Sequence, residues 1–190
     1  HIKMALNIRK FISVTAQLAF EASRIIRDVY ESGNLHKVMK GFNDPVTEVF
    51  PFMTQADIKV QTMVMNGLRS YWPGLKIVGE ESSAFKGELF YDYMQFSQPF
   101  LPQVASIQNH NDEELEIEDS CVWLDPLDGT KSYTNGVLDE VTTLIGLSYR
   151  KRARVGVMGI PYRQIPGGYK FDPRVLVGDV GNPGVFEITQ

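Results

Sequence analysis

Asp125-Pro126-Leu127-Asp128-Gly129-Thr130 joins a predicted strand to a predicted helix. It follows Val122-Trp123-Leu124, an apolar run that predicts a buried strand. Residues Lys131 to Tyr133 predict the first turn of a helix directly after it. A strand, a glycine-containing turn and a helix start form a context that binds phosphate in proteins, because the amides at a helix start attract anions.

The two acids of this stretch can act together. The proline between them fixes its own φ and favours an extended Asp125, so that Asp125 and Asp128 can project from one tight turn. The carbonyl of Leu127 lies between the two acids in the chain. Gly129 permits close approach of the backbone, and the amides of Gly129 and Thr130 can bind a phosphate oxygen.

Acids also stand at two other element boundaries. Asp57 lies at the start of a predicted helix, and Glu80 and Glu81 follow a short predicted strand. Singly, each acid has an ordinary explanation as a helix-start residue, a strand end or a turn former. Together with Asp125 and Asp128 they predict a site for a hard cation, and Mg²⁺ suits oxygen ligands of this kind.

Two helices precede most of the strands. Apolar residues recur at helical spacing from Leu6 to Val29, and Gly33 is placed to end that helix. The second helix begins near Thr54, where Thr54-Gln55-Ala56-Asp57 resembles a capping box, and it ends at Pro73-Gly74. Residues Ser82 to Asp119 predict surface helix and loop with weak periodicity.

The remaining chain predicts strands with antiparallel connections. We expect strands at Lys76 to Val78, Val141 to Tyr149, Arg154 to Ile160, Val175 to Val177 and Val185 to Thr189, and the sequence becomes rich in Gly and Pro after Pro161. The basic residues 150–152 predict a solvated hairpin tip rather than a binding patch. Helices followed by a majority of strands favour an α+β layered domain.

Composition excludes several classes of protein. The chain has 190 residues, enough for one domain, and a formal net charge of −4, which argues against a nucleic-acid partner. No apolar run approaches the about 20 residues that span a membrane. Cys121 is the only cysteine, so no intrachain disulfide can form, and a reducing, cytoplasmic location is expected.

Three motifs carry a resemblance to a known family. The stretches 125–130, Gly79-Glu80-Glu81 and 54–57 occur in the order of the amino-terminal signatures of the inositol monophosphatase superfamily. Within it, residues 131–136 and 138–146 are most similar to the lithium-sensitive 3'(2'),5'-bisphosphate nucleotidases. The segment Ser83 to Asp119 matches weakly. The resemblance implies a layered sugar-phosphatase-like fold, with two helices packed on a largely antiparallel sheet.

The resemblance also implies a ligand set. Glu80, Asp125 and Asp128 would bind metal through their side chains, and Leu127 would bind it through its carbonyl. Two or three Mg²⁺ ions are expected in a complete site, and lithium is expected to inhibit.

Asp57 and Thr130 take the catalytic roles in this resemblance. Asp57 would lie over the attacking water, directly or through an additional metal ion, and Thr130 would orient that water. Gly129 and Thr130 would hold the substrate phosphate. The implied reaction is hydrolysis of the 3'-phosphate of adenosine 3',5'-bisphosphate to AMP, with the sulfated form as a further candidate substrate. An inositol (poly)phosphate 1-phosphatase and an inactive phosphate-binding fragment are the alternatives.

The sequence departs from the family at one point. The family completes its metal site with an aspartate from a Trp-Asp motif, but here Trp72 precedes Pro73 and Trp123 precedes Leu124. We therefore expect residues 1–190 to be the amino-terminal, metal-binding phosphatase domain, without the carboxy-terminal substrate domain. The expected partners are a small bisphosphate substrate and the missing part or a second chain.

Overall fold

The computed structural model describes residues 5–39, 52–83 and 113–189. The prediction made for Ser82 to Asp119 lies largely outside these residues. The elements are β1 (Ala5–Asn7), α1 (Ile8–Glu31), β2 (Val38–Met39), β3 (Phe52–Met53), α2 (Gln55–Tyr71), β4 (Lys76–Gly79), the 3-10 turn η1 (Glu80–Ser83), β5 (Glu114–Glu116), η2 (Ile117–Asp119), β6 (Ser120–Asp128), α4 (Thr130–Thr134), η3 (Leu138–Glu140), β7 (Thr142–Tyr149), β8 (Arg152–Ile165), β9 (Gly168–Asp179) and β10 (Asn182–Thr189).

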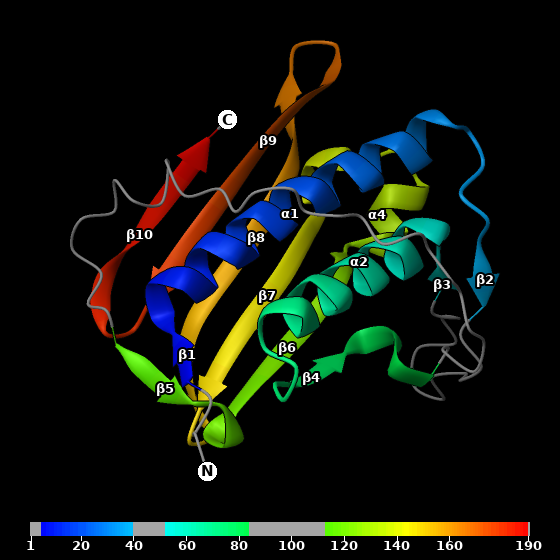
Figure 1. Ribbon diagram of the computed structural model, residues 1–190. Coiled ribbons are helices and arrows are strands. Elements are labelled where there is room, and N and C mark those ends of the chain that lie inside the picture. Colours follow the sequence, from blue (N-terminus) through cyan, green and yellow to red (C-terminus); the bar gives the residue numbers. More distant parts are fainter. Residues whose placement is uncertain (1–4, 40–51, 84–112, 190) are drawn as a thin grey trace, which may run out of the picture.

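A six-stranded sheet carries the fold. Its strand order is β10-β9-β8-β7-β6-β4. β4 runs parallel to β6, and the other neighbouring pairs are antiparallel. Helices α1 and α2 lie side by side on one face, with α1 packed on β8 and β9 and α2 packed on β6 (Figure 1). The predicted α+β layered architecture is confirmed.

Helix α1 begins two residues later than its apolar pattern predicts. Asn7 caps it, because the Asn7 side chain accepts a hydrogen bond from the Lys10 amide at 3.0 Å. Leu6 belongs to β1 instead, where it pairs with Leu115. None of the described helices is long and apolar enough to span a membrane.

Strands β8 and β9 are longer than the sequence predicts. The predicted strand ends at Ile160, whereas β8 continues through Pro161 to Ile165. Pro161 lies where the β8–β9 register shifts, between Ile160 and Tyr162, and Pro173 lies in the β9 segment opposite. A proline has no amide to donate to a neighbouring strand, so an irregularity in the ladder accommodates it.

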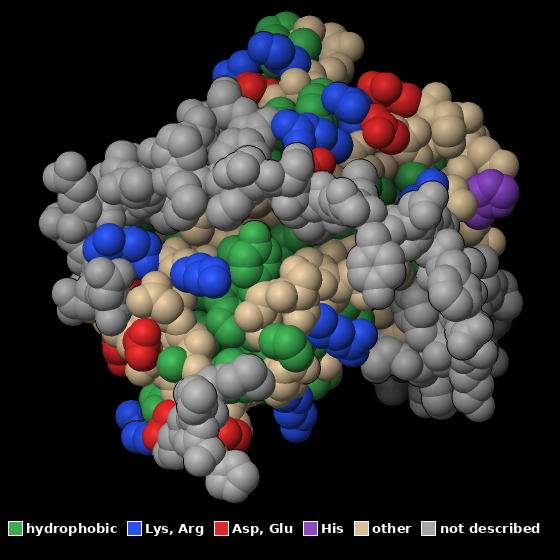
Figure 2. Space-filling view, in the orientation of Figure 1, with side chains coloured by type: hydrophobic (Ala, Val, Ile, Leu, Met, Phe, Trp, Pro, Cys, Tyr) green, Lys and Arg blue, Asp and Glu red, His purple; other side chains and the backbone are tan. Residues whose placement is uncertain are grey.

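The second face of the sheet is apolar. Alternate residues of each strand point away from α1 and α2, and they include Trp123 and Val185, which are 55% and 71% exposed. On the helix side, acidic side chains lie next to basic ones at several places (Figure 2). The outer face, by contrast, exposes large apolar side chains.

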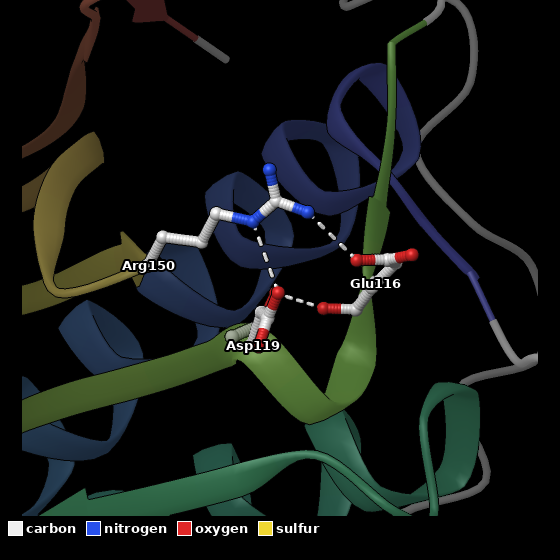
Figure 3. A network of polar contacts seen from close by, with 4 residues as sticks. Glu116, Asp119 and Arg150 are labelled. Carbon is white, nitrogen blue, oxygen red and sulfur yellow. Dashed lines mark hydrogen bonds and ion pairs between the residues drawn. The ribbon is translucent and has the colours of Figure 1, made fainter.

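The hairpin between β7 and β8 is held by ion pairs. Arg150 and Lys151 have φ of 48° and 64°. These values lie in the left-handed region, which is energetically unfavourable for a residue with a Cβ. The Arg150 guanidinium donates to Asp119 Oδ2 at 3.0 Å and to Glu116 Oε2 at 2.9 Å (Figure 3). It also stacks on Tyr149. The predicted hairpin tip is confirmed, and Arg150 has a structural role in it.

We expect Lys151→Gly to stabilise the protein. The left-handed conformation costs an L-residue about 1–2 kcal/mol, and glycine loses about 0.5–1 kcal/mol through unfolded-state entropy. The free energy of unfolding from urea titration should therefore rise by about 0.5–1 kcal/mol. The matched control is Arg152→Gly, in β8, which should lower it. Equal losses for both variants would contradict the argument.

Candidate active site

The two acids of the β6 stretch lie on either side of a β-bulge. Asp125 pairs with Leu144 and Asp128 pairs with Thr142, so the register advances three residues on β6 against two on β7. In a regular strand, residues three apart point to opposite faces. The extra residue in the bulge corrects this, and Asp125 and Asp128 come to the same side. The predicted single tight turn is wrong, because β6 continues to Asp128 and turns only at Gly129.

The residues inside the bulge fix its shape. Pro126 and Leu127 are both buried, and the Thr143 hydroxyl donates to the Pro126 carbonyl at 2.9 Å. The Leu127 amide donates to Asp125 Oδ1 at 3.2 Å, which orients that carboxylate. Thr143 was not predicted from the sequence, since its role depends on strand register.

Gly129 makes the turn from β6 into α4. Its φ is +86°, and a Cβ built there would lie 2.5 Å from the backbone oxygen of Glu140. Only glycine fits both the conformation and the space. The turn at Gly129 therefore places Thr130, which was predicted to orient a water, at the site.

Asp57 and Thr130 meet across 73 residues of sequence. The Thr130 hydroxyl lies 3.3 Å from Asp57 Oδ1 and 3.0 Å from the Leu127 carbonyl oxygen. Asp57 is fully buried, and its Oδ2 accepts from the Thr54 amide at 2.7 Å and the Thr54 hydroxyl at 2.6 Å. The predicted capping box is confirmed. It fixes one carboxylate oxygen of Asp57 and directs the other to Thr130.

Glu80 reaches the same region through parallel pairing. Gly79 at the end of β4 pairs with Leu124, so the next residues of the two strands, Glu80 and Asp125, lie side by side. Burial raises the pKa of Asp125 to about 7, with further contributions from the charge of Glu80, a hydrogen bond with Glu80 and the charge of Asp128. The three predicted metal-ligand side chains are thus close enough to interact.

Glu80 and Asp125 border a groove in the outer face of the sheet. A groove of about 420 Å³ is lined by Val78, Gly79, Glu80, Trp123, Leu124, Asp125, Leu144 and Gly146. A second groove of about 400 Å³ shares Leu144 and Gly146 with it and extends over β8 and β9 toward Val185. The acids therefore lie at one end of a long apolar surface.

The oxygen ligands near Asp125 suit Mg²⁺, but they do not form a complete coordination shell. In the described ranges, no group of three or more His, Cys, Asp or Glu side chains is placed to hold a metal ion. Mg²⁺ is often bound by one or two carboxylates and completes its shell with waters and substrate phosphate. Burial and the neighbouring Glu80 raise the pKa of Asp125, and a bound cation would lower it. Carboxylates, a carbonyl and open positions are what such an ion requires.

Gln61 is a buried polar residue near this site that was not predicted from the sequence. Gln61 is 1% exposed, and its Oε1 accepts from the Glu81 amide at 3.1 Å. Its position four residues after Asp57 was the available signal, because residues at that spacing share a helix face.

The described structure is a layered α+β domain in which carboxylates at a strand end lie near Asp57 and Thr130. Sequence comparison matches residues 7–169 to the inositol monophosphatase family. The chain belongs to this family.

Curated relatives include 3'(2'),5'-bisphosphate nucleotidase 1 of Dictyostelium discoideum, 32% identical over 185 residues, with 91% of this chain and 53% of the relative covered. The Homo sapiens protein of the same name is 34% identical over 167 residues, with 85% and 50% covered. This chain thus spans about half the length of these relatives.

Solved structures share the fold. The extragenic suppressor protein suhB of Bartonella henselae superposes with a TM-score of 0.61 at 23% identity, covering 93% of this chain and 51% of that one. The inositol monophosphatase of Thermotoga maritima gives 0.59 at 16% identity, covering 95% and 52%. In each case the match is to about half of the larger protein.

Gly129→Ala should destabilise the protein more than Gly136→Ala. Both glycines have positive φ, which costs alanine about 1–2 kcal/mol. At Gly129 the new Cβ also meets backbone, whereas at Gly136 it meets only the Tyr30 hydroxyl at 3.2 Å. We expect the free energy of unfolding to fall by an additional about 1–3 kcal/mol at Gly129, measured by urea titration. Equal losses would mean that the turn relaxes around the extra carbon.

Proposed function

We propose that this chain forms the amino-terminal, metal-binding part of a magnesium-dependent phosphomonoesterase that hydrolyses the 3'-phosphate of adenosine 3',5'-bisphosphate to AMP. The observation that carries the proposal is the meeting of Glu80, Asp125 and Asp128 beside the Asp57–Thr130 pair. The relatives at 32–34% identity are named bisphosphate nucleotidases, which supports a nucleotide substrate. The sulfated form of the nucleotide is a further candidate substrate.

The metal would be held by Glu80, Asp125, Asp128 and the Leu127 carbonyl, in a complete site of two or three ions. When bound, Mg²⁺ lowers the pKa of a coordinated water and withdraws charge from phosphate. The chain's own contribution is to keep several anionic oxygens together in a partly buried position. Asp125 is partly buried while Glu80 and Asp128 are exposed, so the site stays open to substrate.

Thr130 and Asp57 would orient the attacking water. The Thr130 hydroxyl has a single proton, and both Asp57 Oδ1 and the Leu127 carbonyl are acceptors within reach. When that proton is donated in a hydrogen bond to Asp57, the lone pairs of the Thr130 oxygen can accept a hydrogen bond from the attacking water. Asp57 is anchored by its capping box and stays in place. The amides of Gly129 and Thr130 would bind the phosphate oxygen.

The rest of the protein would cover the outer face of the sheet. This chain spans about half of its curated relatives, and the apolar grooves of the outer face begin at the acids. A domain docked there would bury Trp123 and Val185 and supply contacts to the nucleoside. It would also bring the remaining metal-ligating carboxylate.

Inositol phosphate is the second candidate substrate. A Drosophila melanogaster relative, 29% identical over 162 residues, is named putative inositol monophosphatase 3. The nucleotide is preferred because the relatives with that name are more similar along the chain.

Thr130→Val in the complete protein should remove most turnover. Valine keeps the shape but can neither accept nor donate a hydrogen bond, and misplacing a reacting group costs about 10²-fold. Thr130→Ser should restore much of the rate. The matched control is Thr134→Val in the same short helix, whose hydroxyl donates only to the Lys131 carbonyl in the described structure.

The assay is phosphate release from adenosine 3',5'-bisphosphate, with inositol 1,4-bisphosphate run in parallel. If phosphate is released faster from the inositol compound, the preferred substrate is an inositol phosphate and not the nucleotide. No release from either compound by the wild-type protein would favour an inactive phosphate-binding role. Full activity of Thr130→Val would remove Thr130 from the mechanism.

Residues 1–190 alone should release little phosphate. The acids near Asp125 would lack the remaining carboxylate, and the outer face would stay exposed. Adding the missing part of the protein should restore turnover and shift Trp123 fluorescence to shorter wavelength as the indole is buried, with Trp123→Phe as the control for the fluorescence change. A rate for the isolated chain equal to that of the complete protein would refute the need for a second part.

A further inference from the structure

Gln61 links helix α2 to the turn that carries Glu80. Its side chain is 1% exposed, and Oε1 accepts from the Glu81 amide at 3.1 Å, across 20 residues of sequence. Glutamine is mostly found on protein surfaces. A buried amide that accepts from the backbone of another element fixes the distance between the two elements.

Gly79 is shaped to receive this side chain. A Cβ at Gly79 would lie 2.3 Å from Gln61 Oε1 and 2.7 Å from its Cδ. The amide therefore packs directly against the backbone at the end of β4. The Gln61 side chain leaves no room for a Cβ at position 79. This packing explains the glycine there without invoking a bound ligand.

The same helix face holds the other half of the site. Gln61 follows Asp57 by four residues, one helical turn, and both side chains are buried. Helix α2 lies against β6 and η1 (Figure 1). Asp57 contacts Thr130 at the end of β6, and Gln61 contacts the turn after β4. Successive turns of one rigid helix thus set the spacing between the two acid-bearing strand ends.

We propose that Gln61 is a positioning residue that holds Glu80 in register with Asp125 for Mg²⁺ binding. The inference rests on the proposed metal-dependent function. Gln61 acts through the Glu81 amide, which directly follows Glu80 in the turn. Without the Gln61 acceptor, the turn that carries Glu80 would lose its hydrogen bond to α2. The Glu80 side chain would then occupy more positions, and part of the free energy of Mg²⁺ binding would be spent on ordering it.

The test compares two variants of the complete protein on the same helix. Gln61→Met keeps the length of the side chain and removes the acceptor. Val64→Ala is the matched control, because Val64 is fully buried in α2 but contacts the core rather than the turn. Both should lower the melting temperature. Only Gln61→Met should weaken Mg²⁺ binding, by about tenfold, measured by calorimetry without substrate.

Two further readouts separate positioning from general destabilisation. Hydrogen exchange of the Glu81 amide should speed up in Gln61→Met and stay unchanged in Val64→Ala. The Mg²⁺ concentration for half-maximal phosphate release should rise in Gln61→Met, while kcat at saturating Mg²⁺ stays within a few-fold of wild type. If Gln61→Met does not fold, Gln61→Asn, which keeps the amide on a shorter side chain, is measured in the same way.

The outcomes distinguish this inference from the proposed function. Equal Mg²⁺ binding by wild type and Gln61→Met would overturn the positioning role alone. Mg²⁺ binding by wild type without phosphate release would overturn the proposed reaction alone, because the calorimetric comparison still stands. A wild-type protein that binds no Mg²⁺ would overturn both.

Discussion

Carboxylates are crowded together in a partly buried position at the end of β6. Burial raises the pKa of Asp125 to about 7, and the neighbouring charges of Glu80 and Asp128 contribute to the rise. Two features of the sheet impose this closeness. The parallel pairing of β4 with β6 ends both strands at one edge, and the bulge brings the second aspartate to the same side. Such an arrangement is costly unless a cation or a proton balances it.

Helix α2 is the frame that keeps the acids from relaxing apart. A capping box ordinarily stabilises only a helix end, but here its carboxylate also faces Thr130. One turn later, Gln61 holds the turn after β4. The Gln61 hydrogen bond is buried and the Asp57–Thr130 hydrogen bond is partly buried, so breaking either would leave a polar group at least partly shielded from water without that partner. Fold stability and site geometry therefore depend on the same contacts.

The sequence predicted the parts of the fold that arise from local rules. Helical spacing, the Thr54–Asp57 cap and the approximate positions of the main strands along the chain follow from neighbouring residues, and these predictions are confirmed. The bulge at Pro126, the continuation of β8 past Pro161 and the Gln61 contact were missed. Each depends on the register of a partner strand or helix far along the chain. The metal and catalytic roles of the site residues came from family resemblance and stay predictions, although the structure brings these residues together.

The outer face connects the site to the remainder of the protein. The groove that begins at Glu80 and Asp125 continues as an apolar surface over β7, β8 and β9. In our proposal a docked domain covers this surface, which would remove water from the acid-bearing end as well as from Trp123. Electrostatic interactions strengthen where water is excluded. The same docking step that buries apolar area would then increase the repulsion among the carboxylates and with it their demand for a cation. Assembly of the protein and loading of its metal site would thereby favour one another, because each lowers the free energy of the other.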